Sequence, residues 1–148
     1  ETSDRTKVVE LRAVQAGFPY YGDLTLADGR PYSHSLLEHG CALVRPELLA
    51  QLDLHVGDEL AIGRGRFTIR GIIANEPGRS VGAFSVGPRV LIDYADLPTT
   101  GLLGYGSRVI RQKLLKVPES GVDSMSKSLD ADFRPVFVRV RSYKDRQE

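Results

Sequence analysis

Two short segments of this sequence come close to patterns that carry chemistry, and the first is a metal-like cluster. His34, Glu38, His39 and Cys41 lie within eight positions of one another. An inverted zinc-protease motif needs two histidines four residues apart on one helix face. Here the spacing is five, which at about 100° per residue turns the two side chains to different sides of a helix. We therefore predict a turn-rich surface loop and no metal site, and the sequence assigns no role to Cys41.

The second segment resembles the nucleophile elbow of a serine hydrolase. Ala83-Phe-Ser-Val-Gly87 differs by one residue from Gly-x-Ser-x-Gly. That elbow lies between a strand and a helix, with its histidine later in the chain. Here Pro88 and a predicted strand follow, and all three histidines precede the serine. Order and context argue against a serine esterase using Ser85, which we keep as an alternative.

Gly63-Arg-Gly-Arg66 suggests a phosphate loop or a nucleic-acid arm. It lacks the Lys-Ser/Thr of a P-loop and precedes a strand, not a helix N-terminus. Glu59 and Thr68 occupy the open face, where a nucleic-acid surface needs aromatic stacking residues. The net charge of +1 also argues against a polyanion-binding surface. We predict a solvated hairpin tip, no cofactor and no nucleic-acid partner.

The densest basic run comprises Arg134, Arg139 and Arg141. One interpretation is the solvent face of an edge strand, where charge discourages aggregation. The other is a patch facing anionic lipid headgroups or an acidic partner. No paired carboxylates, metal cluster or nucleophile–base set remains, so the residues indicate a non-enzymatic domain.

The composition is that of a globular domain. The chain has 148 residues, 41% hydrophobic and 26% charged, which is enough for one domain carrying a small insertion. No apolar run approaches the roughly 18–20 residues that cross a bilayer. A single cysteine excludes an internal disulfide. The chain has no initiator methionine, and we expect it to be a fragment whose missing flanks hold targeting or membrane segments.

Hydrophobic periodicity predicts an α+β fold. In the hairpin after Val56-Gly57-Asp58, Leu60 and Ile62 share one face, and Phe67, Ile69 and Ile73 share one face of the returning strand. A short helical piece is expected within 30–40 and a helical turn at 93–97. The expected strands are 7–14, 23–27, the two arms of the hairpin, 89–92, 107–117 and 136–140, and the expected helices are 46–54 and 121–132.

The order of several segments resembles a known family. The quoted segments are Val9-Glu-Leu-Arg-Ala-Val14, Gly17-Phe-Pro-Tyr-Tyr-Gly22, Leu54-His-Val-Gly-Asp58, Phe67-Thr-Ile-Arg-Gly-Ile-Ile73, Phe84-Ser-Val-Gly-Pro-Arg-Val-Leu-Ile92 and Leu97-Pro-Thr-Thr-Gly-Leu102. Together they are similar to the extracytoplasmic domain of FtsX/MacB-type ABC transporter permeases. Within that superfamily the chain looks most like bacterial permeases associated with a lysophospholipase-type esterase.

The resemblance implies an architecture and a location. It implies a porter-like mixed α/β core built from residues 1–40 and 107–148, with a smaller β-rich insertion at 41–106. The domain would lie on the periplasmic or extracellular face of the bacterial cytoplasmic membrane. ATP hydrolysis would occur on a separate ABC ATPase subunit, reached through the missing membrane part, and no catalytic residue is carried over. A periplasmic protein or a lipid-like substrate would be the partner.

Two glycine-rich loops, 75–87 and 98–106, are the expected contact surfaces. Exposed loops on a rigid scaffold often carry binding, and apolar side chains are stranded in both. Packing of these side chains back onto the core is the competing interpretation, and a free-standing small-molecule-binding β-barrel is the competing function. The candidate partner-binding residues are Arg79 and Phe84 in the first loop and Leu102, Leu103 and Tyr105 in the second.

Overall fold

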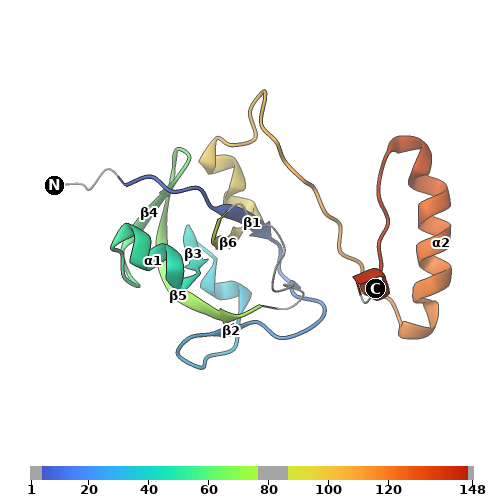
Figure 1. Ribbon diagram of the computed structural model, residues 1–148, viewed down its shortest axis with the longest axis horizontal. Helices are drawn as coiled ribbons and strands as arrows, with labels where there is room; N and C mark the ends of the chain where they lie inside the picture. Colours follow the sequence, from blue (N-terminus) through green and yellow to red (C-terminus); the bar gives the residue numbers. More distant parts are fainter. Residues whose placement is uncertain (1–4, 77–86, 147–148) are drawn as a thin grey trace. The chain divides into compact units, whose positions relative to one another are not determined.

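The computed structural model describes residues 5–76 and 87–146. The chain separates into two compact units, Glu1–Arg111 and Gln112–Glu148. The first contains the β-sheet and the short helix α1, and the second contains the longer helix α2 (Figure 1). Sheet and helices together confirm the predicted α+β class.

One six-stranded mixed sheet organises the first unit. Its path is β1-β6-β3-β5-β2, and β4 pairs with β5 beside this path. β1 runs parallel to β6 and β3 runs parallel to β5, whereas β3 and β6 are antiparallel. The path has β1 and β2 at its two ends and does not join them, so it is not a closed barrel within the described residues. The strands are β1 Glu10–Val14, β2 Thr25–Leu26, β3 Cys41–Val44, β4 Glu59–Ile62, β5 Gly65–Asn75 and β6 Arg89–Asp93.

The sheet is buried on both faces at its centre. All four residues of β3 are buried. Ala42 and Val44 pack into one hydrophobic cluster with Leu48 of α1, while Leu43 packs into a second cluster with Leu91. A strand covered on both faces reads as a continuous apolar run, which explains why Cys41-Ala-Leu-Val44 shows no alternation.

The β4–β5 hairpin forms as predicted, with one exception in its faces. Leu60, Ile62, Phe67 and Ile69 pack in the first cluster, whereas Ile73 packs in the second. The prediction that Ile73 shares that face is wrong because the β3–β5 register shifts between Ala42 and Leu43. A bulge of this kind changes which side chains point to each side of the sheet.

The described part of the first unit also contains three short helices. α1 spans Pro46–Leu52 and buries Leu48 and Leu49, slightly shorter than the predicted 46–54. It ends where Asp53 adopts a left-handed conformation. The 3₁₀ helix η1, His34–Leu36, is the short helical piece predicted in 30–40. A second, η2, Tyr94–Thr100, extends the predicted turn at 93–97 into the second glycine-rich loop.

The second unit contains no buried residue in the part that the structure describes. Its helix α2, Val122–Phe133, confirms the predicted helix at 121–132, and the chain then turns and runs back beside it (Figure 1). Every residue described in this unit is exposed or half-buried. Among the described residues, no helix has the length and apolarity needed to cross a membrane. The 3₁₀ helices of this unit are η3 Glu119–Gly121, η4 Arg134–Val136 and η5 Tyr143–Arg146.

Two predicted strands are wrong. Residues 107–117 are described and carry no regular secondary structure, and η4 followed by irregular chain occupies the predicted strand 136–140. A strand is stabilised by a hydrogen-bonded neighbour, which neither segment has within the described residues. The division into a lobe of 1–40 and 107–148 around an insertion at 41–106 stays a prediction. β1 and β2, from the first forty residues, share one sheet with β3, β5 and β6.

Candidate interaction surface

The hairpin tip at Gly63-Arg64 is fastened to the end of η2. The Arg64 backbone N–H donates to the Thr100 carbonyl over 2.9 Å. Gly63 has a left-handed φ of 56°, and a Cβ there would lie 2.2 Å from the same carbonyl oxygen. Only glycine fits this close approach. The tip was predicted to be a plain solvated turn, and its contact with a segment 36 residues later is a finding of the structure.

The same contact positions the second glycine-rich loop. Thr100 is buried, and its hydroxyl donates to the Leu97 carbonyl over 2.7 Å and accepts from the Leu102 N–H over 3.2 Å. The Arg64 side chain lies against Gly101, where a Cβ would approach the Arg64 Nε to 2.5 Å. The base of the loop is therefore held by backbone and side-chain contacts together.

Beyond this base the loop exposes apolar side chains. Leu102 and Leu103 are each 41% exposed, and Tyr105 is fully exposed. The chain after η2 projects away from the sheet (Figure 1). None of the three belongs to either core cluster, although Leu102 lies close to the hairpin tip at Gly63. Whether they bind a partner stays a prediction, and Arg79, Phe84 and Ser85 lie outside the described residues.

A half-buried chain of polar groups joins η1 to the end of β6. His34 Nε2 lies 3.3 Å from Asp93 Oδ1, and the Tyr32 hydroxyl lies 3.3 Å from His34 Nδ1. Carboxylate, imidazole and hydroxyl in this order resemble a proton relay. However, burial and then the Asp93 charge raise the pKa of Tyr32 to about 12, so the phenol keeps its proton. The group acts as a brace between the two segments, which sequence reasoning missed because its members are 59 residues apart.

A buried ion-pair cluster links β1, β6 and the end of β5. Arg89 Nη2 lies 2.8 Å from Glu10 Oε1, and Arg89 Nη1 pairs with Glu76, whose side chain is 1% exposed. Burial lowers the pKa of Arg89, but the hydrogen bond and charge of Glu76, with those of Glu10, outweigh it and raise that pKa. A carboxylate this deeply buried needs its cation, so the cluster is structural.

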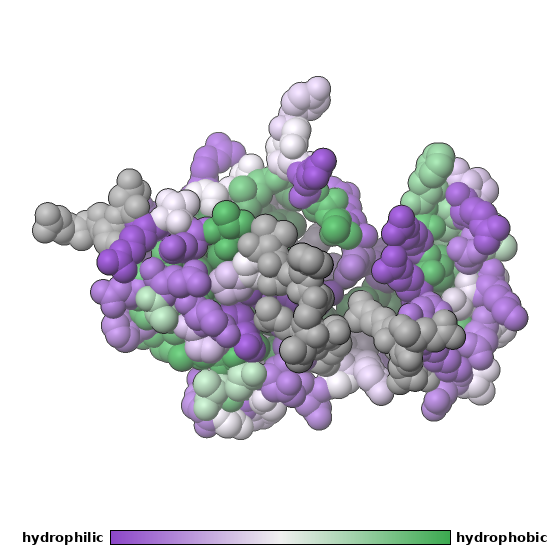
Figure 2. Space-filling model, in the orientation of Figure 1, coloured by the Kyte–Doolittle hydropathy of each residue, from purple (hydrophilic) through white to green (hydrophobic). Residues whose placement is uncertain are grey.

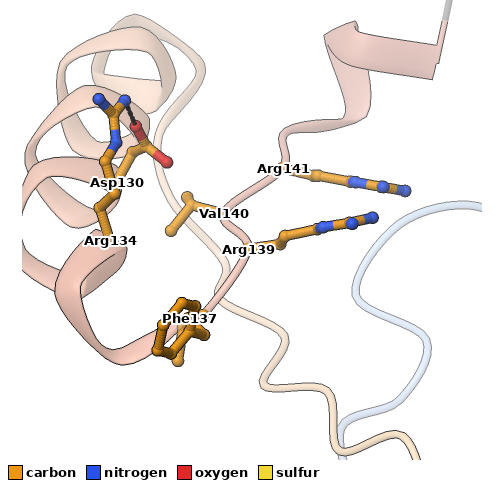
Figure 3. Close-up of a pocket in the computed structure, with 7 residues that line it drawn as sticks. Asp130, Arg134, Phe137, Arg139, Val140 and Arg141 are labelled. Atoms are coloured by element: carbon orange, nitrogen blue, oxygen red, sulfur yellow. Dashed lines mark hydrogen bonds and ion pairs between the residues drawn. The ribbon is translucent and has the colours of Figure 1, made fainter.

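A cavity of about 460 Å³ lies within the second unit. Arg139 and Arg141 extend side by side, while Val140 points toward α2 and Arg134 pairs with Asp130 on the helix (Figure 3). Phe137 is almost fully exposed, and hydrophobic side chains are open to the surface along this unit (Figure 2). The basic run predicted from sequence is therefore a group of exposed arginines, with Arg134 at the end of α2 and Arg139 and Arg141 on irregular chain, and it is not an edge strand. The lining residues are Asp130, Arg134, Phe137, Val138, Arg139, Val140 and Arg141.

A cavity in the first unit is much smaller, at about 100 Å³. Ligand pockets commonly measure about 300–1,000 Å³. Its lining includes Asp28, Arg30 and Arg70 beside Val56 and Ile72. It does not favour a free-standing module that binds small molecules.

The described residues thus define a small α+β domain with an exposed apolar loop, followed by a unit that has no core. No family model matches the chain. Over 134 residues, 89% of its length, the chain is 31% identical to a protein of Escherichia coli (strain K12) named uncharacterized ABC transporter permease YbbP. The chain spans 16% of that relative's length. The similarity supports a domain of the ABC-permease type.

Proposed function

We propose that this chain is the extracytoplasmic domain of an ABC transporter permease. In this role it couples cytoplasmic ATP hydrolysis to movement and to the binding of a substrate or partner protein outside the membrane. The observation that carries the proposal is 31% identity with a permease over 89% of the chain. Identity spread over that length is a property of a whole domain, whereas a short motif would match only locally.

The finer assignment follows the resemblance of the ordered segments. We place the chain with FtsX/MacB-type permeases, nearest to those associated with a lysophospholipase-type esterase. The division into a core lobe of 1–40 and 107–148 and an insertion at 41–106 belongs to this proposal. We also propose that an ABC ATPase subunit is the partner of the full-length protein inside the cell.

A non-enzymatic role agrees with the chemistry of the described residues. Among the described residues, Tyr32, His34 and Asp93 form a relay-like group that braces η1 against the end of β6. The exposed side chains of Leu102, Leu103 and Tyr105 are suited to contact rather than catalysis.

Labelling of a single cysteine in the full-length protein tests the location. Ala50 is exposed on α1, and the native Cys41 is buried. We expect Ala50→Cys to react with a membrane-impermeant maleimide applied to intact spheroplasts. The unmodified protein, which carries Cys41, is the matched control and reacts only after denaturation. Labelling of Ala50→Cys only after the cells are lysed would place the domain in the cytoplasm and end the proposal.

Coupling is tested separately by the ATPase. We expect the full-length permease to co-purify with an ABC ATPase subunit whose hydrolysis rate changes when this domain is deleted. An ATPase rate that is the same with and without the domain would remove the coupling role. That result would not bear on the proposed extracytoplasmic location of the domain.

A further inference from the structure

The segment that follows η2 combines exposed apolar side chains with basic ones. Leu102, Leu103 and Tyr105 are followed by Val109, which is 46% exposed, and Ile110, which is 87% exposed. Monomeric soluble proteins rarely leave this many apolar side chains open in one short stretch. The exposure therefore calls for a surface that covers them.

The charge of the segment has one sign. Between Asp96 and Glu119 the sequence has no acidic residue and four basic ones, Arg108, Arg111, Lys113 and Lys116. Within the described residues none of these four forms an ion pair with a carboxylate. Unpaired cations beside apolar side chains complement a surface that is both anionic and apolar.

The base of the segment is rigid. The Arg64 backbone and side chain and the buried Thr100 hold Gly101 and Leu102 in place, as described above. Fixed contacts at one end reduce the entropy that residues 102–111 lose on docking. The apolar side chains are thus presented outward by the fold.

We propose that residues 102–111 dock onto the surface of an anionic lipid bilayer, with Lys113 and Lys116 adding charge. Apolar side chains would enter the headgroup boundary, where tyrosine is favoured, and the basic side chains would face anionic headgroups. A bilayer is favoured over a protein because the segment lacks acidic residues and its relative is a membrane permease. The inference rests on the proposed role of this loop as a contact surface and names its partner.

Vesicle binding by the complete 148-residue chain tests this. We expect co-sedimentation with vesicles of phosphatidylcholine and phosphatidylglycerol, and much weaker binding to vesicles of phosphatidylcholine alone. Each basic residue near an anionic surface is worth about 1 kcal/mol, or roughly fivefold in binding. Replacing the four cations (Arg108→Gln, Arg111→Gln, Lys113→Gln and Lys116→Gln together) should weaken binding at least about tenfold.

A matched control removes four exposed cations of the first unit that lie outside this segment. It combines Lys7→Gln, Arg30→Gln, Arg66→Gln and Arg70→Gln, which change the net charge by the same amount. We expect this control to retain most of the binding. If both variants lost binding equally, the proposal would be wrong, because vesicle binding would then depend only on the net charge of the chain.

The apolar part is tested by Tyr105→Ser combined with Ile110→Ser. We expect this variant to lose the binding that persists at high salt, while its thermal unfolding stays unchanged because both side chains are exposed. Absence of binding to either kind of vesicle would overturn the proposal and leave a protein partner for the loop. The spheroplast labelling at Ala50 is independent of this loop, so failure of either proposal is recognised separately.

Discussion

The two units of this chain differ in what holds them together. The first contains two clusters of buried side chains, one on each face of a mixed sheet, and a buried ion-pair cluster at its edge. The second contains a twelve-residue helix and several 3₁₀ turns, without a buried residue in its described part. Both show regular structure, but only the first buries enough apolar surface to offset the loss of chain entropy.

The contrast shows that a segment can form a helix without burying its apolar side chains in a core. α2 forms where the sequence predicts it, yet Met125 and Phe133 remain 42% exposed on its surface. A helix of this length is marginal in water, since most helical stability in proteins comes from tertiary packing. We therefore expect the second unit to be only marginally helical by itself.

Cutting the chain between Arg111 and Gln112 should give the largest difference between the two units, because we expect only the first to fold by itself. We expect residues 1–111 to unfold cooperatively in urea, within about 1 kcal/mol of the complete chain, because they contain both core clusters. Residues 112–148 should show little helix by circular dichroism. A cooperative, helical unfolding transition in the isolated 112–148 peptide would contradict the comparison.

Removing one arginine from each unit should separate buried from exposed ion pairs. Arg89→Met leaves the Glu76 carboxylate buried without its cation, and we expect a loss of about 3–5 kcal/mol in the free energy of unfolding. Arg134→Met breaks the exposed pair with Asp130 in the second unit and should change the free energy of unfolding by less than about 0.5 kcal/mol. Urea titration measures both.

The double variant Arg89→Met with Glu76→Met controls for packing in the same experiment. It removes the orphaned carboxylate, so we expect it to recover part of the stability lost in Arg89→Met. If Arg89→Met alone costs no more than Arg134→Met, the cluster is solvated and the first unit is less tightly closed than the structure describes.

Gly63→Ala should test the contact between the hairpin tip and η2 that positions the exposed loop. The added Cβ meets the Thr100 carbonyl, so the hairpin tip has to move away from η2. Gly106→Ala is the matched control: it also has a positive φ, but its Cβ meets nothing within 4 Å. We expect Gly63→Ala to cost about 1–3 kcal/mol more than Gly106→Ala in thermal unfolding. Equal costs would mean that the tip does not hold the loop.

The smallest effect should be the alkaline dependence of stability. The folded pKa of Tyr32 is raised to about 12 from 10.0, so the unfolded chain loses this proton first. Stability from this group is therefore complete below pH 10 and falls as pH rises toward 12. Because Tyr32 is only about half-buried, we expect the loss to be about 1 kcal/mol or less after allowance for solvent screening.

Tyr32→Phe should flatten the fall in unfolding free energy between pH 10 and 12. Tyr105→Phe, which removes the hydroxyl of a fully exposed tyrosine, is the matched control. An identical slope in all three proteins would show that Tyr32 does not titrate differently on folding.

Local patterns predicted most of the first unit. The alternation in Leu60, Ile62, Phe67 and Ile69 predicted the hairpin, and Pro46 with its following leucines predicted α1. These elements are correct because the same apolar side chains that set the periodicity also form the core. The exposed loop residues Leu102, Leu103 and Tyr105 were identified by the same logic, as apolar side chains outside any periodic segment.

The wrong predictions concern features that depend on a neighbouring strand. Residues 107–117 have the composition of a strand, but composition does not supply the neighbouring strand that a ladder requires. The predicted face of Ile73 was wrong for a related reason. The bulge lies in its own strand, where Arg70 is the extra residue opposite Ala42 and Leu43, and a bulge appears only when the strand is paired.

The sequence by itself determined the α+β class, the positions of both α-helices and the β4–β5 hairpin, because these depend on the periodicity of neighbouring residues. Only the tertiary structure decided the strand order, the clamp between Arg64 and Thr100, and the pairing of Glu76 with Arg89. These contacts join residues 13 to 36 positions apart, and the β1–β6 pairing joins residues 79 positions apart. Their energy depends on burial and close approach, which arise only after the chain has folded.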